Sequence, residues 1–180
     1  MGSYLDFHHF ESRYTCVVDA PPSEAYRRLK GIRAKALPLT RVLFGARTLP
    51  ARLLAQETLR LEGGKPLFEL LQQQGFVLLN EIPSTEIALG AVGRFWKLNS
   101  GFEKISGARE FREFTDPGVA KAVMVWRFEA RDGGGTLVTT ETAIEVKAPG
   151  PRHWFGLYWM LIRAGSGLIR KEIFRAIQRA

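Results

Sequence analysis

Two arginines, Arg163 and Arg170, are the residues of this chain whose type and spacing best support specific chemistry. They lie seven residues apart in a helical pattern, on the same side as Trp159 and Ile173. A guanidinium on an apolar helix face needs an acceptor, because an unpaired buried charge is costly. That acceptor is either a carboxylate of the protein or the carboxylate or phosphate of a ligand. The alternative is that both side chains reach solvent at the rim of the helix.

Thr140 and Thr142 alternate along a predicted strand, where their hydroxyls either orient a ligand or are ordinary strand residues. Binding pockets combine many apolar groups with a few polar ones. We therefore predict a ligand-binding cavity lined by Phe95, Met124, Trp126, Phe128, Thr140, Thr142, Tyr158, Trp159, Ile162, Arg163, Arg170 and Ile173. The same aromatic side chains are also typical of a solid core.

The other reactive residue types lack the companions that catalysis or metal binding requires. His8 and His9 are adjacent, with no third ligand at a metal-binding spacing. Cys16 falls on the inward face of the first strand without a His placed to activate it, which predicts an inert thiol. Ser166 lies within a helix, not at the strand-to-helix turn of a hydrolase nucleophile. We predict no metal, no cofactor and no positioned acid or base, which favours binding over catalysis.

Length and composition indicate one globular domain over residues 1–180. Hydrophobic residues make up 46% and charged residues 24%, which excludes a disordered chain. The single cysteine excludes an intramolecular disulfide and fits a reducing compartment. No signal-peptide pattern is present at the start, and the longest dense apolar run, 154–162, is too short to span a bilayer. These features predict a cytoplasmic protein.

The net charge of +8 is concentrated in two predicted helical regions. Residues 27–65 hold ten Lys or Arg against two Glu, and residues 150–180 hold six against one. Solvated helix faces account for this charge, and so does an acidic partner or an anionic membrane surface. Nucleic acid is disfavoured because no binding motif accompanies the charge. The oligomeric state is left open.

The first half of the chain predicts a strand followed by short helices. Alternation over 10–18 predicts a half-buried strand. Asp19 or Ser23 as a cap, with prolines in the first turn, predicts a helix that ends at Gly31. Further short helices and loops are expected over 32–65, including one at 49–61, and another helix at 66–74.

The second half predicts antiparallel strands and one long helix. Two hairpins are expected, 76–82 with 85–96 and 119–131 with 136–147, and residues 108–115 form a strand or a short helix. The alternation predicts one covered sheet face and one wet face, with the wet face carrying Lys121, Arg127, Glu129, Glu141 and Glu145. The last thirty residues form an amphipathic helix that covers the sheet, weakened or bent at 165–167.

This order of elements resembles the START-like superfamily, also called the helix-grip or SRPBCC fold. Three segments carry the resemblance: VVDAPPSEAY at 17–26, TTET at 139–142 and YWMLIRAGSGLIR at 158–170, the last similar to a bacterial branch. The resemblance implies an α+β fold in which a curved antiparallel sheet grips a long C-terminal helix over a cavity. It also implies a hydrophobic or amphipathic ligand, such as a lipid, an isoprenoid or a polyketide-like compound.

The favoured hypothesis is a carrier or sensor of such a small molecule. A cyclase- or dehydratase-type enzyme that uses the same cavity is one alternative, and an inward His, Asp, Glu or Tyr near Arg163 or Arg170 would indicate it. The other alternative is an interaction module that uses its basic helices on a membrane, a ribosome or an acidic protein. The superfamily contains carriers, sensors and enzymes, so function depends on the site.

Overall fold

The computed structural model describes residues 4–5, 8–43, 64–95, 101–146 and 152–180, and the side chains of the last range from residue 165 onwards. The elements in chain order are β1 (Phe10–Val18), α1 (Pro22–Gly31), a 3-10 turn (Ala34–Ala36), α3 (Leu67–Gln73), β2 (Val77–Ile82), β3 (Glu86–Gly93), α4 (Ala108–Glu113), β4 (Ala120–Ala130), β5 (Thr136–Val146) and α5 (Arg152–Arg179). Residues 38–43 are also helical. None of the described helices is both long and apolar enough to cross a bilayer.

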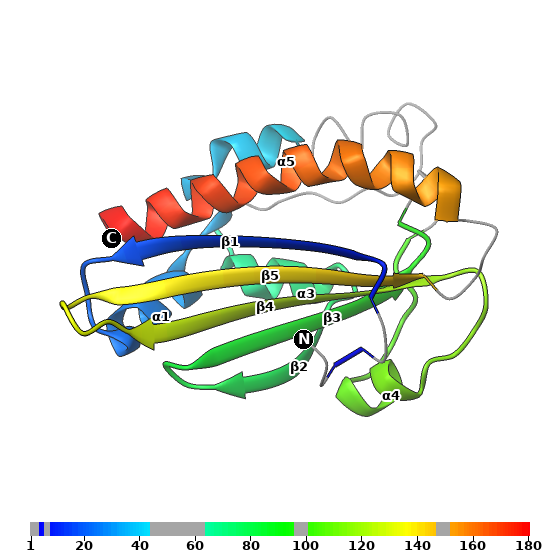
Figure 1. Cartoon of the computed structure of the whole chain (residues 1–180), viewed down its shortest axis with the longest axis horizontal. Helices are drawn as coiled ribbons and strands as arrows, with labels where there is room; N and C mark the ends of the chain where they lie inside the picture. The colour runs from blue at the N-terminus through cyan, green and yellow to red at the C-terminus, as the bar shows by residue number, and fades with distance from the viewer. Residues whose placement is uncertain (1–3, 6–7, 44–63, 96–100, 147–151) are drawn as a thin grey trace.

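The strands form one curved antiparallel sheet in the order β1-β5-β4-β3-β2. Figure 1 shows α5 as a single long helix that runs alongside this sheet next to β1. The predicted α+β helix-grip architecture is therefore confirmed. Both hairpins are confirmed as well. Their turns use residues with positive φ, which are Ser84 in the first and Gly134 and Gly135 in the second.

The predictions for the helices have mixed outcomes. The helix at 66–74 is confirmed as α3, followed by Gly75 at φ +100°. The segment 108–115, which the sequence left open between strand and helix, contains the helix α4. The predicted helix at 49–61 lies outside the described residues.

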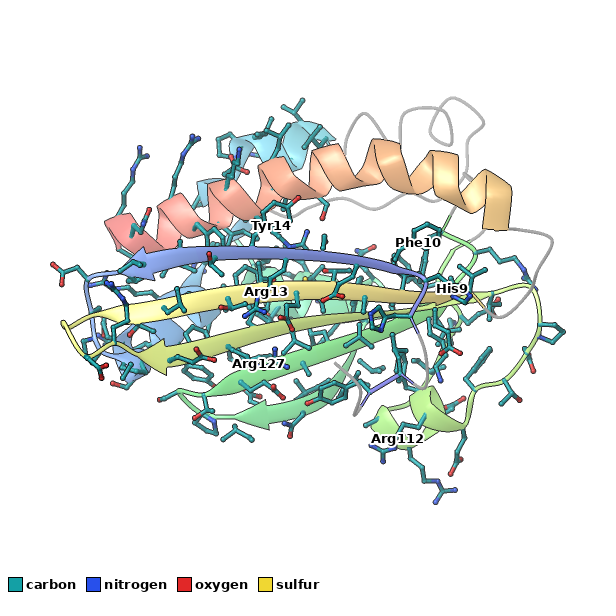
Figure 2. All side chains as sticks on the ribbon, in the orientation of Figure 1. His9, Phe10, Arg13, Tyr14, Arg112 and Arg127 are labelled. Atoms are coloured by element: carbon teal, nitrogen blue, oxygen red, sulfur yellow. The ribbon has the colours of Figure 1, made fainter. Side chains whose placement is uncertain are left out.

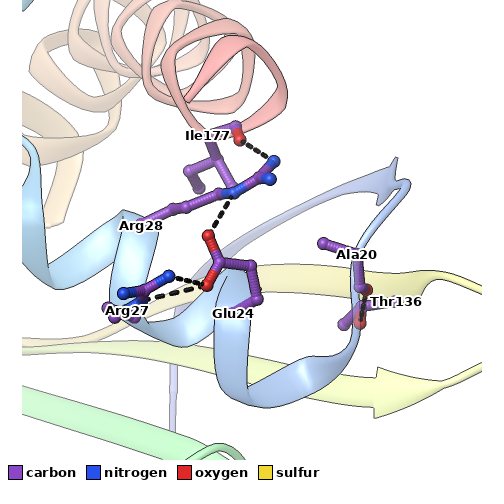
Figure 3. A network of polar contacts seen from close by, with 6 residues as sticks. All are labelled: Ala20, Glu24, Arg27, Arg28, Thr136 and Ile177. Atoms are coloured by element: carbon purple, nitrogen blue, oxygen red, sulfur yellow. Dashed lines mark hydrogen bonds and ion pairs between the residues drawn. The ribbon is translucent and has the colours of Figure 1, made fainter.

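The predicted side-chain cap of α1 is wrong. Pro21 occupies the cap position and no side chain caps the helix. Glu24 instead accepts hydrogen bonds from Arg27 and Arg28 in the next turn, and Arg28 Nη1 donates to the carbonyl oxygen of Ile177 on α5 at 3.2 Å (Figure 3). The prolines set the backbone of the first turn. In place of a side-chain cap, the hydrogen bonds of Glu24 and the contact between Arg28 and α5 stabilise this helix.

The main core lies between the inner face of the sheet and helices α1, α3 and α5. Trp126 on β4 is 1% exposed and meets Phe174 of α5 edge to face, with ring centroids 5.8 Å apart. Leu29 of α1 and Ile177 of α5 are fully buried in the same cluster. The C-terminal half of α5 is therefore packed against a solid core.

The prediction of a wet outer face is wrong for most of its charged residues. Lys121, Glu141 and Glu145 are 2%, 6% and 6% exposed, and only Glu129 among the predicted residues is exposed. Leu5 and Phe111 belong to a second apolar cluster on this face. Alternation within β4 and β5 could not reveal this cover, because it comes from the N-terminal segment and from α4, which are distant in sequence.

Several charged residues of the outer face are paired with one another. Arg127 donates to Glu86 at 3.0 Å and to Glu141 at 2.6 Å, and Arg13 lies 3.3 Å from Glu141. Figure 2 shows Arg13 and Arg127 on neighbouring parts of the sheet. Burial opposes ionisation of Glu86, but hydrogen bonds from Tyr4 and Asn80 and the charge of Arg127 outweigh it and lower its pKa. This network satisfies the rule that buried charges need partners.

Candidate functional site

Polar side chains gather on the inner face of the sheet where β1, β5 and β4 run side by side. Tyr14, Thr140 and Trp126 stand opposite one another in one row of the register, and Ser12, Thr142 and Met124 form the next row. Opposite residues in an antiparallel pair point to the same side. Figure 2 shows Tyr14 and Phe10 on the side of β1 that faces α5.

Arg170 of α5 reaches into these rows. Its side chain is buried, and the residue is 5% exposed. The guanidinium donates to Thr142 Oγ1, to Ser166 Oγ and, at 3.3 Å, to the Ser166 carbonyl oxygen. Its Cζ lies 5.5 Å from the centroid of the Tyr14 ring, at the distance of a cation–π contact. The alternative that this arginine reaches solvent at the rim of the helix is therefore wrong.

The partners of Arg170 are neutral. Among the described residues, no carboxylate forms an ion pair with it, and its Nε atom is buried without a hydrogen-bond partner. Burial lowers the pKa of Arg170 to about 10, and the nearby Tyr14 opposes this shift. A pKa near 10 still leaves the guanidinium charged at neutral pH. The protein thus keeps a buried positive charge whose strongest natural partner, an anion, is missing from its described surroundings.

An unsatisfied hydroxyl lies beside this charge. Thr140 is fully buried, and its Oγ1 has no hydrogen-bond partner among the described residues. Thr140 is two residues from Thr142 on the same strand, so the two side chains share a face. Buried hydroxyls are normally hydrogen-bonded, so an unsatisfied one on the sheet face that Arg170 contacts through Thr142 calls for an explanation, and a ligand's acceptor group is one.

A glycine allows α5 to come close enough to form this site. A Cβ placed on Gly167 would lie 2.7 Å from the Tyr14 hydroxyl oxygen. The predicted weakening of the helix at 165–167 is not what the structure shows, because α5 is continuous from Arg152 to Arg179. The absence of a side chain at Gly167 instead gives room for Tyr14, while Ser166 in the same run bonds to Arg170 one turn later.

Burial changes along the inner face at the position of Arg170. On the central strand β4, Trp126 and Phe128 are buried, whereas Met124 and Ala122 are half-buried. Met124 and Ala122 are therefore partly accessible, although Leu89 and Ile144 beside them on the same face are buried. Arg170 lies next to this change in burial, because it bonds to Thr142, the residue opposite Met124.

The structure separates the predicted cavity residues into groups. Arg170, Thr140, Thr142 and Met124 come together as just described. Trp126, Phe128 and Ile173 belong to the main core cluster. Phe95 packs in a neighbouring cluster with Phe10, Ala122 and Ile144, with its ring centroid 5.3 Å from that of Phe102. Four predicted residues lie outside the described side chains: Tyr158, Trp159, Ile162 and Arg163.

Sequence reasoning missed three members of the site, Ser12, Tyr14 and Ser166. Ser12 lies on the inward alternation of β1 and is 6% exposed, but a serine between charged residues gives no sign of burial. Ser166 precedes Arg170 by four residues, the spacing that brings helix side chains together. This four-residue spacing is the sequence pattern from which the contact between Ser166 and Arg170 could have been predicted.

The remaining reactive residues are engaged elsewhere. His9 Nδ1 accepts a hydrogen bond from the Val146 amide at 3.2 Å, and His8 lies 3.2 Å from Glu11. Burial raises the pKa of the Cys16 thiol to about 11, which makes the reactive thiolate scarce near neutral pH. Within the described ranges, no three His, Cys, Asp or Glu residues gather as metal ligands.

Comparison with known proteins gives solved structures only. No family model matches the chain, and no curated protein matches it significantly. A protein from Deinococcus radiodurans is 15% identical over 93% of each chain, with a TM-score of 0.39. A protein from Mesorhizobium loti is 11% identical over 95% of this chain and 98% of its own, with a TM-score of 0.41. The structure of Ara h 8.0201 is 14% identical over 93% and 97%, with a TM-score of 0.36. These TM-scores are below 0.5, so no conclusion rests on these likenesses.

Replacing Arg170 by methionine should not destabilise the ligand-free protein. The Arg170→Met variant removes an uncompensated buried charge and keeps similar volume, so we expect the free energy of unfolding to rise by about 1 kcal/mol. Arg127→Met is the matched comparison, because that arginine is paired with Glu86 and Glu141. Its loss should cost about 2 kcal/mol, since it removes one cationic partner from each of two carboxylates. Urea denaturation at pH 7 measures both. Equal destabilisation by the two substitutions would contradict the assignment of different roles.

Proposed function

We propose that this protein is a single START-like domain over residues 1–180 that binds a hydrophobic or amphipathic small molecule between the sheet and α5, as a carrier or sensor. The observation that carries the proposal is Arg170, a buried charge with neutral partners only among the described residues. Evolution tolerates such a cost where it serves binding. A carboxylate or phosphate on the ligand would supply the missing partner.

The polar end of the ligand is assigned to Arg170 and Thr140. Arg170 contributes the positive charge and an N–H at Nε, and Thr140 contributes a hydroxyl. Because Thr142 and Ser166 already accept hydrogen bonds from the guanidinium, they fix its orientation before the ligand arrives. A pre-oriented donor loses less entropy on binding than a free side chain.

The apolar part of the ligand is assigned to the partly accessible stretch of the inner face. Met124 and Ala122 are half-buried there, and Phe10 and Phe95 lie in the adjacent cluster. The opposite direction is filled by Trp126 and Phe174, which leaves no room for a ligand chain. We therefore expect the ligand to extend from Arg170 towards the N-terminal half of α5.

A matched pair of fluorescent probes tests this proposal. Dansylaminoundecanoic acid and its methyl ester differ in the charge of the head group but share the apolar chain. Because a charge-assisted hydrogen bond contributes about 1.5–3 kcal/mol, the acid should bind the wild-type protein at least tenfold more tightly than the ester. In Arg170→Met this ratio should fall to about one. Fluorescence titration measures both dissociation constants.

Arg175→Met is the control for this experiment, because Arg175 is an exposed arginine of the same helix. It should keep the wild-type ratio. If neither probe binds, or if Arg170→Met still prefers the acid tenfold, the proposed site is wrong.

One observation favours a second candidate, a cyclase- or dehydratase-type enzyme. Tyr14 is an inward phenol whose ring is 5.5 Å from the Arg170 guanidinium, which is the kind of neighbour that acid–base chemistry needs. In such an enzyme, Arg170 would stabilise an oxyanion while Tyr14 transfers a proton. Compounds extracted from purified wild-type and Tyr14→Phe protein should then differ, by the mass of water for a dehydration or in chromatographic retention for an isomerising cyclisation. A carrier or sensor would retain the same compound in both, which would rule out this candidate.

A further inference from the structure

A carboxylate joins the helical segment 38–43 to the side of α5 that faces away from the sheet. Glu172 Oε1 accepts from the Leu39 amide at 2.8 Å, and Glu172 Oε2 accepts from the Thr40 amide at 2.8 Å and the Thr40 hydroxyl at 2.6 Å. Thr40 is 2% exposed, so its end of this contact is protected from water, whereas the Leu39 end is exposed. Figure 1 shows this segment beside α5. The two helices therefore present one joined surface.

Exposed aliphatic side chains stand on this surface. Val42 is 67% exposed, Leu168 is 45% exposed and Leu39 is 37% exposed. Leu168 lies one helical turn before Glu172, and Leu39 is bound to Glu172 through its backbone. Exposed aliphatic groups that gather on adjoining elements mark a surface that a membrane or another molecule covers. Scattered single ones do not.

Positive charges surround these aliphatic groups. Lys171 and Arg175 share the outer side of α5 with Leu168. Arg41 lies on the 38–43 segment and Lys35 in the 3-10 turn just before it, and all four basic residues are exposed. Within the described residues 34–43 and 165–180, Glu172 is the only acidic side chain, and its oxygens are occupied by the 38–43 segment. The surface is therefore both apolar and strongly basic.

We propose that this basic-apolar face, made of Lys35, Leu39, Arg41, Val42, Leu168, Lys171 and Arg175, docks on the surface of a bilayer that contains anionic lipids. Basic side chains would contact the head groups while the three aliphatic side chains enter the boundary with the acyl chains. Nucleic acid would satisfy the charges but would leave Val42 and Leu168 without a role. This inference is independent of the ligand proposed at Arg170.

Vesicle flotation tests the docking face. Wild-type protein should bind vesicles of 70% phosphatidylcholine and 30% phosphatidylglycerol, and should bind pure phosphatidylcholine vesicles at least tenfold more weakly. The charge variant Lys171→Glu with Arg175→Glu should lower the partition coefficient on anionic vesicles at least tenfold. The apolar variant Val42→Ser with Leu168→Ser should lower it about tenfold with no change in net charge.

The matched control is Arg109→Glu with Arg112→Glu, the same charge change on two exposed arginines of α4. This control should bind like the wild type, and thermal melting confirms that every variant is folded. Equal loss of binding in the α4 control would show that net charge alone drives binding and would overturn the proposal. Unchanged binding by the apolar variant, together with equally tight binding of wild type to heparin, would indicate a polyanion surface instead.

Discussion

The packing of α5 across the inner face of the sheet is the contact that orders the rest of the molecule. Its C-terminal half is fixed by Ile173, Phe174 and Ile177 against a solid core, and Arg28 of α1 bonds to the same end of the helix. This fixed end places Arg170 at the edge of the core, facing β1 and β5. The position of the site therefore follows from hydrophobic packing, and its chemistry follows from the few polar residues that this packing brings together.

Arg127 and Arg170 show how the same type of side chain serves different purposes on the two faces of the sheet. Arg127 lies on the outer face between two carboxylates, where its charge is compensated and contributes to stability. Arg170 lies on the inner face among hydroxyls and a phenol, where its charge is not compensated within the described residues. Stability explains the first arrangement but not the second. A buried charge that lowers stability is instead expected where binding has been selected.

Local patterns predicted the architecture well because they depend on neighbouring residues. Alternation identified the strands, and Gly134 and Gly135 marked the tight hairpin. Helical periodicity placed Arg170 on the apolar side of the helix but left open whether its side chain turns inward or reaches solvent. Contacts between distant segments could not be predicted in this way. The apolar cluster on the outer face joins Leu5 to Val125 and Ala143, and the close approach at Gly167 involves Tyr14, more than 150 residues earlier. One sequence does not reveal which of its segments meet.

Native mass spectrometry followed by organic extraction tests the central claim, that Arg170 is retained for a ligand with an anionic group. The purified wild-type protein should carry a discrete excess mass that extraction releases as an acidic amphipathic compound. The Arg170→Met protein, folded and at least as stable, should lack it. A compound without an acidic group, or one retained equally by Arg170→Met, would contradict the assignment of the guanidinium as the ligand's anchor.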